Sequence, residues 1–195
     1  MKISVSSYSF QQYINAGKLA HFDVIQKAHD MGFEAIEFID LPAPSYEEQV
    51  AYAHKLRAEA DRLGMTINAY TIGGNLYQAT PEASAAEVER LKKQVDIAAI
   101  LGCSVMRHDV CYGTGKTGTS RSFGLMLPTI AENTRAVTEY AATKGIVTMS
   151  ENHGYIAQDA DRLLRLFAAI SASLTLKNSG FSQRIRASSP RIIAK

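Results

Sequence analysis

The sequence is poor in cysteine and contains no long apolar run, and both absences narrow its class. Its two cysteines, Cys103 and Cys111, are separated by seven residues, which matches neither a disulfide framework nor a paired zinc motif and favours a reducing cytoplasm. No run of about eighteen apolar residues and no arginine-flanked apolar N-terminus occurs, so the sequence predicts neither a membrane span nor export. At 195 residues, 46% of them hydrophobic and 21% charged, the chain is long enough for one sizeable core and short for two domains.

Acidic residues are absent after Asp161, and this makes the charge of the chain uneven. Residues 1–161 contain 14 Lys and Arg and all 19 Asp and Glu, whereas residues 162–195 contain 7 Lys and Arg and no acid. A basic tail of this kind can be an electrostatic arm that binds nucleic acid. The internal repeat of the chain leads us to a different interpretation of the tail.

A repeated pattern of helix end, glycine and strand runs through the chain. It is visible in MGFEAIEF, LGMTINAY, LGCSVMRH and KGIVTMSE, whose glycines are 32, 38 and 43 residues apart. We predict helices over 22–31, 46–63, 85–101 and 128–143, the last with Pro128 in its first turn, and strands over 1–5, 33–38, 65–70, 103–108 and 146–149. Alternating strands and helices at this spacing predict a parallel sheet of about five βα units.

Two sheet topologies fit this pattern, an open doubly wound sheet and a closed barrel. The first strand-to-helix turn, Ser7 to Gln11, contains no glycine and so lacks the phosphate fingerprint of dinucleotide-binding sheets. Polar or ionisable residues recur instead at the strand ends: Tyr8, Glu37, Tyr70, His108 and Glu151. This favours an α/β parallel (β/α) barrel of the TIM type, incomplete, with about five recognisable βα units of eight.

Several stretches resemble the sugar phosphate isomerase/epimerase family of xylose isomerase-like TIM barrels. They are SVSSYSF, MGFEAIEF, LKKQVDIAAILGCSVMRHD and above all TMSENHG, and the resemblance covers about residues 1–170. It implies a divalent metal (Mn, Co, Mg or Zn) held at the barrel mouth by Glu, Asp, His and Glu from strands five to eight. It also implies isomerase or epimerase chemistry on a small sugar or sugar phosphate, with proton transfer α to a carbonyl through a metal-stabilised enediolate.

Only the first of these implied ligands has a match, Glu151. No acid follows Asp161 and no histidine follows His153, and a complete barrel usually needs about 250 residues. We therefore hypothesise that residues 1–170 are a partial barrel and that the Ser/Arg-rich tail, 171–195, is not native family sequence, as in a truncated or frameshifted reading frame. Because metal affinity depends on ligand number, we expect little or no turnover from this chain alone.

Glu151 is the predicted catalytic residue and metal ligand, at the C-terminal end of the last predicted strand. If the strand stays extended, Val147, Met149, Glu151 and His153 share one face. Alternatively, Glu151 is a solvated or ion-paired carboxylate. The predicted substrate-binding residues are His108, His153, Glu37, Tyr8 and Tyr70.

Each predicted substrate contact has a structural alternative. His108 lies between Arg107 and Asp109 and could be part of an ordinary surface cluster. Glu37 could pair with a cation, because an unpaired carboxylate on an apolar face is costly. Tyr8 and Tyr70 could be packing residues with a solvated hydroxyl, and His153 could cap the region that follows it.

A glycine-rich loop, Gly113 to Gly118, resembles a phosphate-binding loop without meeting its requirements. The motif needs a further glycine where this chain has Val110, and a helix directly after it. We predict instead that residues 111–127 form a lid, from which Lys116 or Arg121 meets a substrate phosphate.

Two further functions stay open. One is the endonuclease branch of the same barrel, which cuts DNA at abasic sites with a zinc cluster. Only His108 supports this alternative. The other is a non-catalytic barrel fragment. We expect a small sugar or sugar phosphate as the partner, no nucleic acid and no membrane, with a homo-oligomer possible through exposed strand edges.

Overall fold

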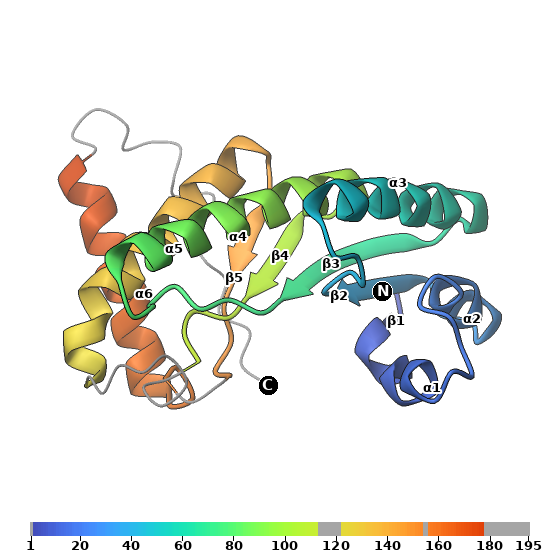
Figure 1. Cartoon of the computed structure of the whole chain (residues 1–195), viewed down its shortest axis with the longest axis horizontal. Coiled ribbons are helices and arrows are strands. Elements are labelled where there is room, and N and C mark those ends of the chain that lie inside the picture. The colour runs from blue at the N-terminus through green and yellow to red at the C-terminus, as the bar shows by residue number, and fades with distance from the viewer. Residues whose placement is uncertain (1, 113–121, 154–155, 178–195) are drawn as a thin grey trace. The chain divides into compact units, whose positions relative to one another are not determined.

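The computed structural model describes residues 2–112, 122–153 and 156–177, with side chains up to residue 171. Strands and helices alternate along it (Figure 1). The strands are β1 (Ser4–Ser6), β2 (Ala35–Ile39), β3 (Thr66–Ile72), β4 (Val105–His108) and β5 (Val147–Met149). The helices are the 3₁₀ helix η1 (Ser7–Phe10), α1 (Gln11–Asn15), α2 (Val24–Asp30), α3 (Tyr46–Leu63), α4 (Pro81–Leu101), α5 (Phe123–Thr143) and α6 (Ala160–Lys177).

The five described strands follow the chain in the order β1-β2-β3-β4-β5. β1 and β3 both pair in parallel with β2, and the register between β2 and β3 shifts at Ile36 and Glu37. This confirms the predicted α/β class with a parallel sheet. No helix in the described part of the chain is long and apolar enough to cross a membrane.

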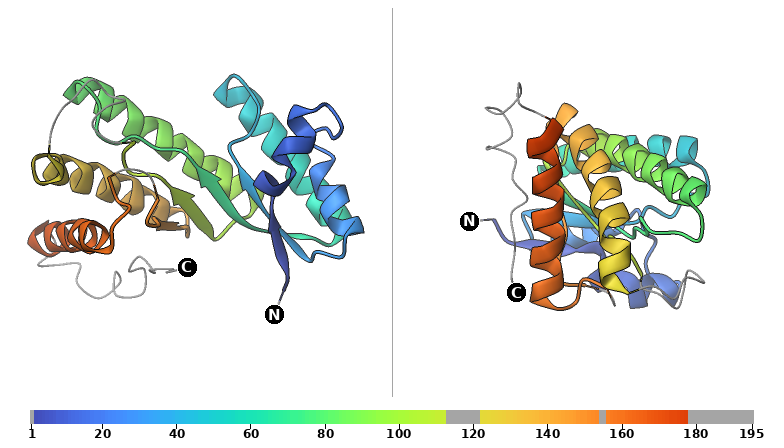
Figure 2. Two further views of the ribbon diagram at one scale, coloured as in Figure 1. Left: turned by 90° about the horizontal axis from the view of Figure 1, so that it is seen from below. Right: turned by 90° about the vertical axis from the view of Figure 1, so that its left-hand side faces the viewer.

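Two compact units make up the chain, and each has its own packing. The first unit contains residues 1–72 and 93–106, and the second contains residues 73–92 and 107–195. The first unit buries Ile36, Phe38, Leu56 and Ile67 among its core residues. In the second unit α5 and α6 lie side by side (Figure 2) over a core that includes Met126, Ile130, Ile156, Leu163 and Leu166.

Local signals in the sequence set the helix ends. Ser45 and Glu48 form a reciprocal capping box at the start of α3. The four repeat glycines, Gly32, Gly64, Gly102 and Gly145, have φ of 85°, 66°, 76° and 72°. L-residues rarely adopt this left-handed conformation, so the predicted role of these glycines as helix stops is confirmed.

The starts of two helices and one strand face differ from the sequence prediction. α4 begins at Pro81, four residues before the predicted start of the helix over 85–101. α5 begins at Phe123, so Pro128 lies inside the helix rather than in its first turn. A proline there removes one backbone donor, which a 21-residue helix tolerates. On β5, Thr148 and the following Ser150 are buried, whereas Val147 and Met149 are only half-buried. The face of β5 that leads to Glu151 is therefore the more open one.

Candidate functional site

Four side chains of the second unit meet at the C-terminal ends of β4 and β5, and we call them the Arg107 cluster: Arg107, Asp109, Glu151 and His153. Arg107 Nη2 lies 2.7 Å from Asp109 Oδ1 and donates to Glu151 Oε1 at 2.9 Å. His153 Nδ1 lies 3.0 Å from the same Asp109 Oδ1. One guanidinium nitrogen thus bridges two carboxylates, and one carboxylate oxygen serves both a guanidinium and an imidazole.

Strand alternation and one turn build this cluster. Arg107 and Asp109 are two residues apart at the end of β4, so their side chains leave the backbone on the same side, and His108 points the opposite way. After β5, the backbone N–H of His153 donates to the carbonyl oxygen of Glu151 at 2.8 Å. This turn carries both side chains of the ENH segment to the Arg107 side chain.

The four side chains of the Arg107 cluster differ in their exposure to solvent. The side chains of Arg107 and Asp109 are 14% and 13% exposed, whereas those of Glu151 and His153 are 44% and 61% exposed. The Arg107–Asp109 pair is thus largely shielded from water, which strengthens its attraction. Glu151 uses Oε1 for Arg107 and stays open to solvent, so a small molecule can reach its carboxylate.

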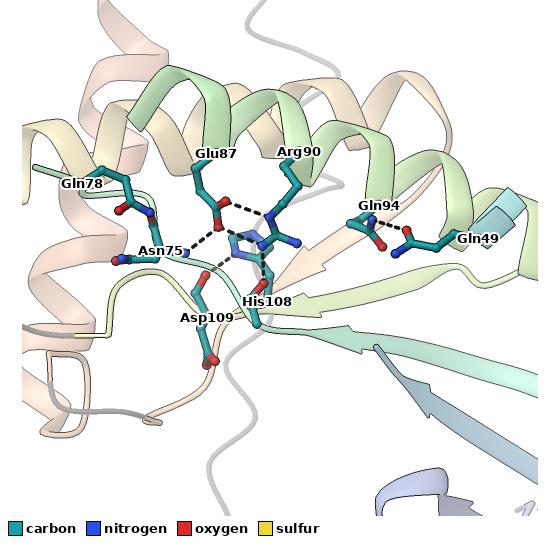
Figure 3. A network of polar contacts seen from close by, with 9 residues as sticks. Gln49, Asn75, Gln78, Glu87, Arg90, Gln94, His108 and Asp109 are labelled. Carbon is teal, nitrogen blue, oxygen red and sulfur yellow. Dashed lines mark hydrogen bonds and ion pairs between the residues drawn. The ribbon is translucent and has the colours of Figure 1, made fainter. Parts of the chain in front are cut away.

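His108 lies inside the protein and is 1% exposed. Its Nδ1 is 2.9 Å from the carbonyl oxygen of Asp109, and because a carbonyl only accepts, Nδ1 carries the proton and donates (Figure 3). Among the described residues, no group bonds its buried Nε2. Burial is the main cause that lowers the pKa of this imidazole, so His108 is neutral at pH 7. The predicted substrate contact is therefore a buried side chain that holds the backbone next to the Arg107 cluster.

The loop after β3 is fastened to α4 beside His108. Arg90 donates to the carbonyl of Gly73 at 2.7 Å, and Glu87 accepts the backbone N–H of Asn75 at 2.8 Å and pairs with Arg90 at 2.8 Å (Figure 3). Gly74 lies against the carbonyl oxygen of Asp109, where an added Cβ would collide with that oxygen. The backbone of Asp109 is thus held both by His108 and by the close approach of this loop.

The other three predicted site residues belong to the first unit. Tyr8, in η1, is 68% exposed. Glu37 is half-buried on β2 and accepts from Ser6 Oγ at 3.2 Å. Tyr70 is fully buried, and its hydroxyl donates to Gln94 at 2.8 Å. Gln94 in turn donates to Gln49 at 2.8 Å (Figure 3). Tyr70 is thus a core residue whose hydroxyl is bonded inside the unit.

The sequence singled out His108 and placed its neighbours Arg107 and Asp109 only in an alternative, an ordinary surface cluster. The signal that identifies them is their two-residue spacing at a strand end, which places two charges on one side. The predicted lid contacts Lys116 and Arg121, the Gly113 to Gly118 loop and the tail beyond residue 177 lie outside the described residues.

The described residues do not fit a divalent metal. Among them no group of three or more His, Cys, Asp and Glu side chains is arranged to hold an ion. The carboxylate of Glu151 is instead bonded to a guanidinium, which already supplies a positive charge there. The zinc cluster of the endonuclease alternative likewise has no counterpart in this part of the chain.

A hollow of about 500 Å³ lies elsewhere in the second unit. It is lined by residues 77–81, 84, 85, 129, 132 and 133. Two of its polar groups already hold its own loop: Ser84 Oγ accepts from the backbone N–H of Gln78 at 2.9 Å, and Asn133 donates to the carbonyl of Leu76 at 2.8 Å. We therefore place the candidate site at the Arg107 cluster, where charged groups converge.

Comparisons with known proteins agree with the fold. A family model of the xylose isomerase-like TIM barrel matches residues 25–176. No protein of curated function matches the chain in sequence.

Three solved structures illustrate the likeness. A protein of Anabaena variabilis named as a sugar phosphate isomerase/epimerase is 20% identical with a TM-score of 0.65, over 87% of this chain and 60% of that one. D-psicose 3-epimerase of Clostridium cellulolyticum is 16% identical with a TM-score of 0.64, over 85% and 60%. 3-Keto-D-glucoside 4-epimerase of E. coli is 12% identical with a TM-score of 0.62, over 88% and 72%. At these identities the likeness is one of fold, and the chain spans 60% of the length of the first two proteins.

Proposed function

Because the chain belongs to the xylose isomerase-like TIM barrel family, we propose that it is an isomerase or epimerase of a small sugar or sugar phosphate and that the Arg107 cluster is its reaction site. The observation that carries this proposal is the position of Glu151. Its carboxylate lies just beyond the C-terminal end of β5, where barrels of this class carry out their chemistry, and it is held by Arg107 while 44% exposed.

In the proposed reaction Glu151 moves a proton at the carbon next to a sugar carbonyl. Arg107 binds Oε1, which leaves Oε2 to accept the proton and return it. Asp109 binds Nδ1 of His153, so Nε2 of that exposed imidazole can bond a substrate hydroxyl. Both groups act on the solvent side of the cluster.

A divalent metal would supply Lewis-acid polarisation of the sugar carbonyl. The described residues do not fit such an ion, so we assign no step to it. Without that polarisation the proton transfer meets a high barrier. We therefore propose that this chain alone turns over slowly.

The test is exchange of the substrate α-proton for deuterium. The chain would be incubated in D₂O with a panel of ketoses, aldoses and their phosphates, and exchange would be followed by NMR, which detects proton transfer even when little product accumulates. We expect slow exchange with at least one sugar and its loss in Glu151→Gln. The matched control is Glu132→Gln, because this exposed glutamate of the same unit lines the hollow instead.

Three outcomes would contradict parts of the proposal. Absence of exchange and of thermal stabilisation with every sugar would support the non-catalytic alternative. Loss of exchange in Glu132→Gln but not in Glu151→Gln would move the site to the hollow. Fast, metal-dependent epimerisation would show that the slow turnover is wrong.

Three further properties belong to this proposal. We place the chain in the cytoplasm, which is supported by its having only two cysteines, Cys103 and Cys111, both of them buried. We keep residues 1–170 as the barrel part and 171–195 as a separate tail. A homo-oligomer stays a prediction, which analytical ultracentrifugation of the full chain would test.

A further inference from the structure

The Arg107 cluster has the composition of a cation site but contains its own cation. Two carboxylates and one imidazole, from Asp109, Glu151 and His153, are the oxygen and nitrogen donors that divalent metals accept. Asp109 and Glu151 both face one guanidinium nitrogen, and His153 reaches the cluster through Asp109. Arg107 Nη2 lies 2.7 Å from Asp109 and 2.9 Å from Glu151, while His153 Nδ1 lies 3.0 Å from the shared Asp109 oxygen.

Arg107 is held by charge pairing rather than by a full set of hydrogen bonds. Its side chain is 14% exposed, and its Nε is buried without a bonding partner among the described residues. A guanidinium usually satisfies its donors in a planar fork, so this one is held mainly by the two negative charges that face Nη2. The group that best replaces it is another cation.

The charges of the cluster also favour a cation at the position of the guanidinium. The two carboxylates carry two negative charges, and Arg107 neutralises one of them. A divalent ion would neutralise both, but it could not share the space and the carboxylate oxygens with a guanidinium, because two cations at contact distance repel strongly in a shielded site.

We propose that Arg107 is an internal substitute for a metal ion: it occupies the carboxylate cluster of Asp109 and Glu151 and excludes divalent cations such as Mn²⁺ from it. Removal of the guanidinium then leaves the carboxylates of Asp109 and Glu151 without the cation that they share. This inference concerns metal binding by the chain's own residues and does not depend on sugar turnover.

The experiment is a Mn²⁺ titration of the full chain, followed by calorimetry and by the electron paramagnetic resonance signal of free Mn²⁺. Four proteins are compared: wild type, Arg107→Gln, Arg107→Lys, and the double variant Arg107→Gln with Glu151→Gln. We expect no Glu151-dependent binding in wild type and a gain of about ten-fold or more in affinity in Arg107→Gln, because the repulsion between the guanidinium and the ion is removed. The double variant should lose this gain, and Arg107→Lys should bind like wild type because it keeps a positive charge.

A matched control is Arg135→Gln, which removes another buried arginine of the same unit. Arg135 lies 3.9 Å from Glu132 and 3.8 Å from Glu139, so two carboxylates are near it without a converging imidazole. This variant should gain no Mn²⁺ affinity. A gain equal to that of Arg107→Gln would overturn the proposal, since it would reflect a general loss of positive charge.

Two other results would overturn it as well. One is a folded Arg107→Gln protein, verified by circular dichroism, that gains no affinity. The other needs no Arg107 variant: if Mn²⁺ raises the melting temperature of wild type but not of Glu151→Gln, the guanidinium does not exclude the ion. Failure of the sugar exchange test would leave these metal titrations unchanged, so the two proposals can fail separately.

Discussion

Replacing Asp109 with asparagine tests how strongly the Arg107 cluster is held together. The change keeps the shape of the side chain and removes its charge. It leaves Arg107, which is 14% exposed, with the single remaining carboxylate of Glu151, which is 44% exposed, and it also removes the negative partner of His153.

The expected loss follows from the burial of the pair. A hydrogen bond to a charged group contributes about 1.5–3 kcal/mol, and breaking a fully buried ion pair costs about 3–5 kcal/mol. Because Arg107 keeps Glu151 and some access to water, we expect Asp109→Asn to lower the free energy of unfolding by about 2 kcal/mol. Glu151→Gln should cost only about 0.5–1 kcal/mol, since water screens the more exposed partner.

Urea unfolding, followed by circular dichroism and tyrosine fluorescence, measures these losses. The chain has nine tyrosines and no tryptophan, so both signals report on the whole fold. The matched control is Asp61→Asn, which removes a carboxylate from a surface pair. In this pair the side chain of Asp61 is 57% exposed and that of Arg57 is 39% exposed, so the change should cost about 0.5 kcal/mol or less. A loss in Asp109→Asn no larger than in Asp61→Asn would refute the shielded ion pair.

Three further outcomes are expected. Gly74→Ala should lose about 1–3 kcal/mol of unfolding free energy, because its Cβ would collide with the carbonyl of Asp109. Gly124→Ala, whose Cβ inside α5 would meet Arg165 Nη2 at an ordinary contact distance of 3.9 Å, should gain about 0.5–1 kcal/mol, and equal effects of the two changes in urea would contradict this. Burial lowers the pKa of His108, so below pH 6.5 the unfolded chain binds a proton at this residue that the folded chain does not, and stability should fall as the pH drops. His108→Gln should reduce this pH dependence of the melting temperature, and an unchanged dependence would exclude His108 as its source. Burial raises the pKa of the Cys103 thiol to about 12, so iodoacetamide at pH 8 should label it only in urea, as peptide mass spectrometry would show; labelling of the native chain would contradict the burial.

Much of the fold could be predicted because local signals agree with tertiary packing. Gly64 follows a long amphipathic run that begins after Ser45, and α3 spans the predicted residues Tyr46–Leu63. The short segments η1 and α1 were not predicted, since they have neither a regular apolar period nor a clear stop signal. The start of α5 was also missed, because proline at 128 suggested a first turn that lies five residues earlier.

The candidate site was predicted less completely than the fold. Glu151 and His153 were identified from the TMSENHG segment, and the structure brings them together with Arg107 and Asp109. The two-residue period of a strand could have shown that Arg107 and Asp109 lie on one side of β4 and His108 on the other. It could not show that one nitrogen of Arg107 touches both carboxylates, since that depends on contacts between β4 and β5 ends 44 residues apart.

The sequence by itself determined the alternation of strands and helices, the left-handed glycines that end four helices, and the strand end at which Glu151 emerges. These features depend on backbone conformation and on the period of apolar residues, both of which are local. Only the tertiary structure decided that His108 is buried, that Tyr70 bonds Gln94 in a core, and that Arg107 fills the space between Asp109 and Glu151. Burial and charge pairing arise between segments distant in the chain, so they appear only when the strands are placed side by side.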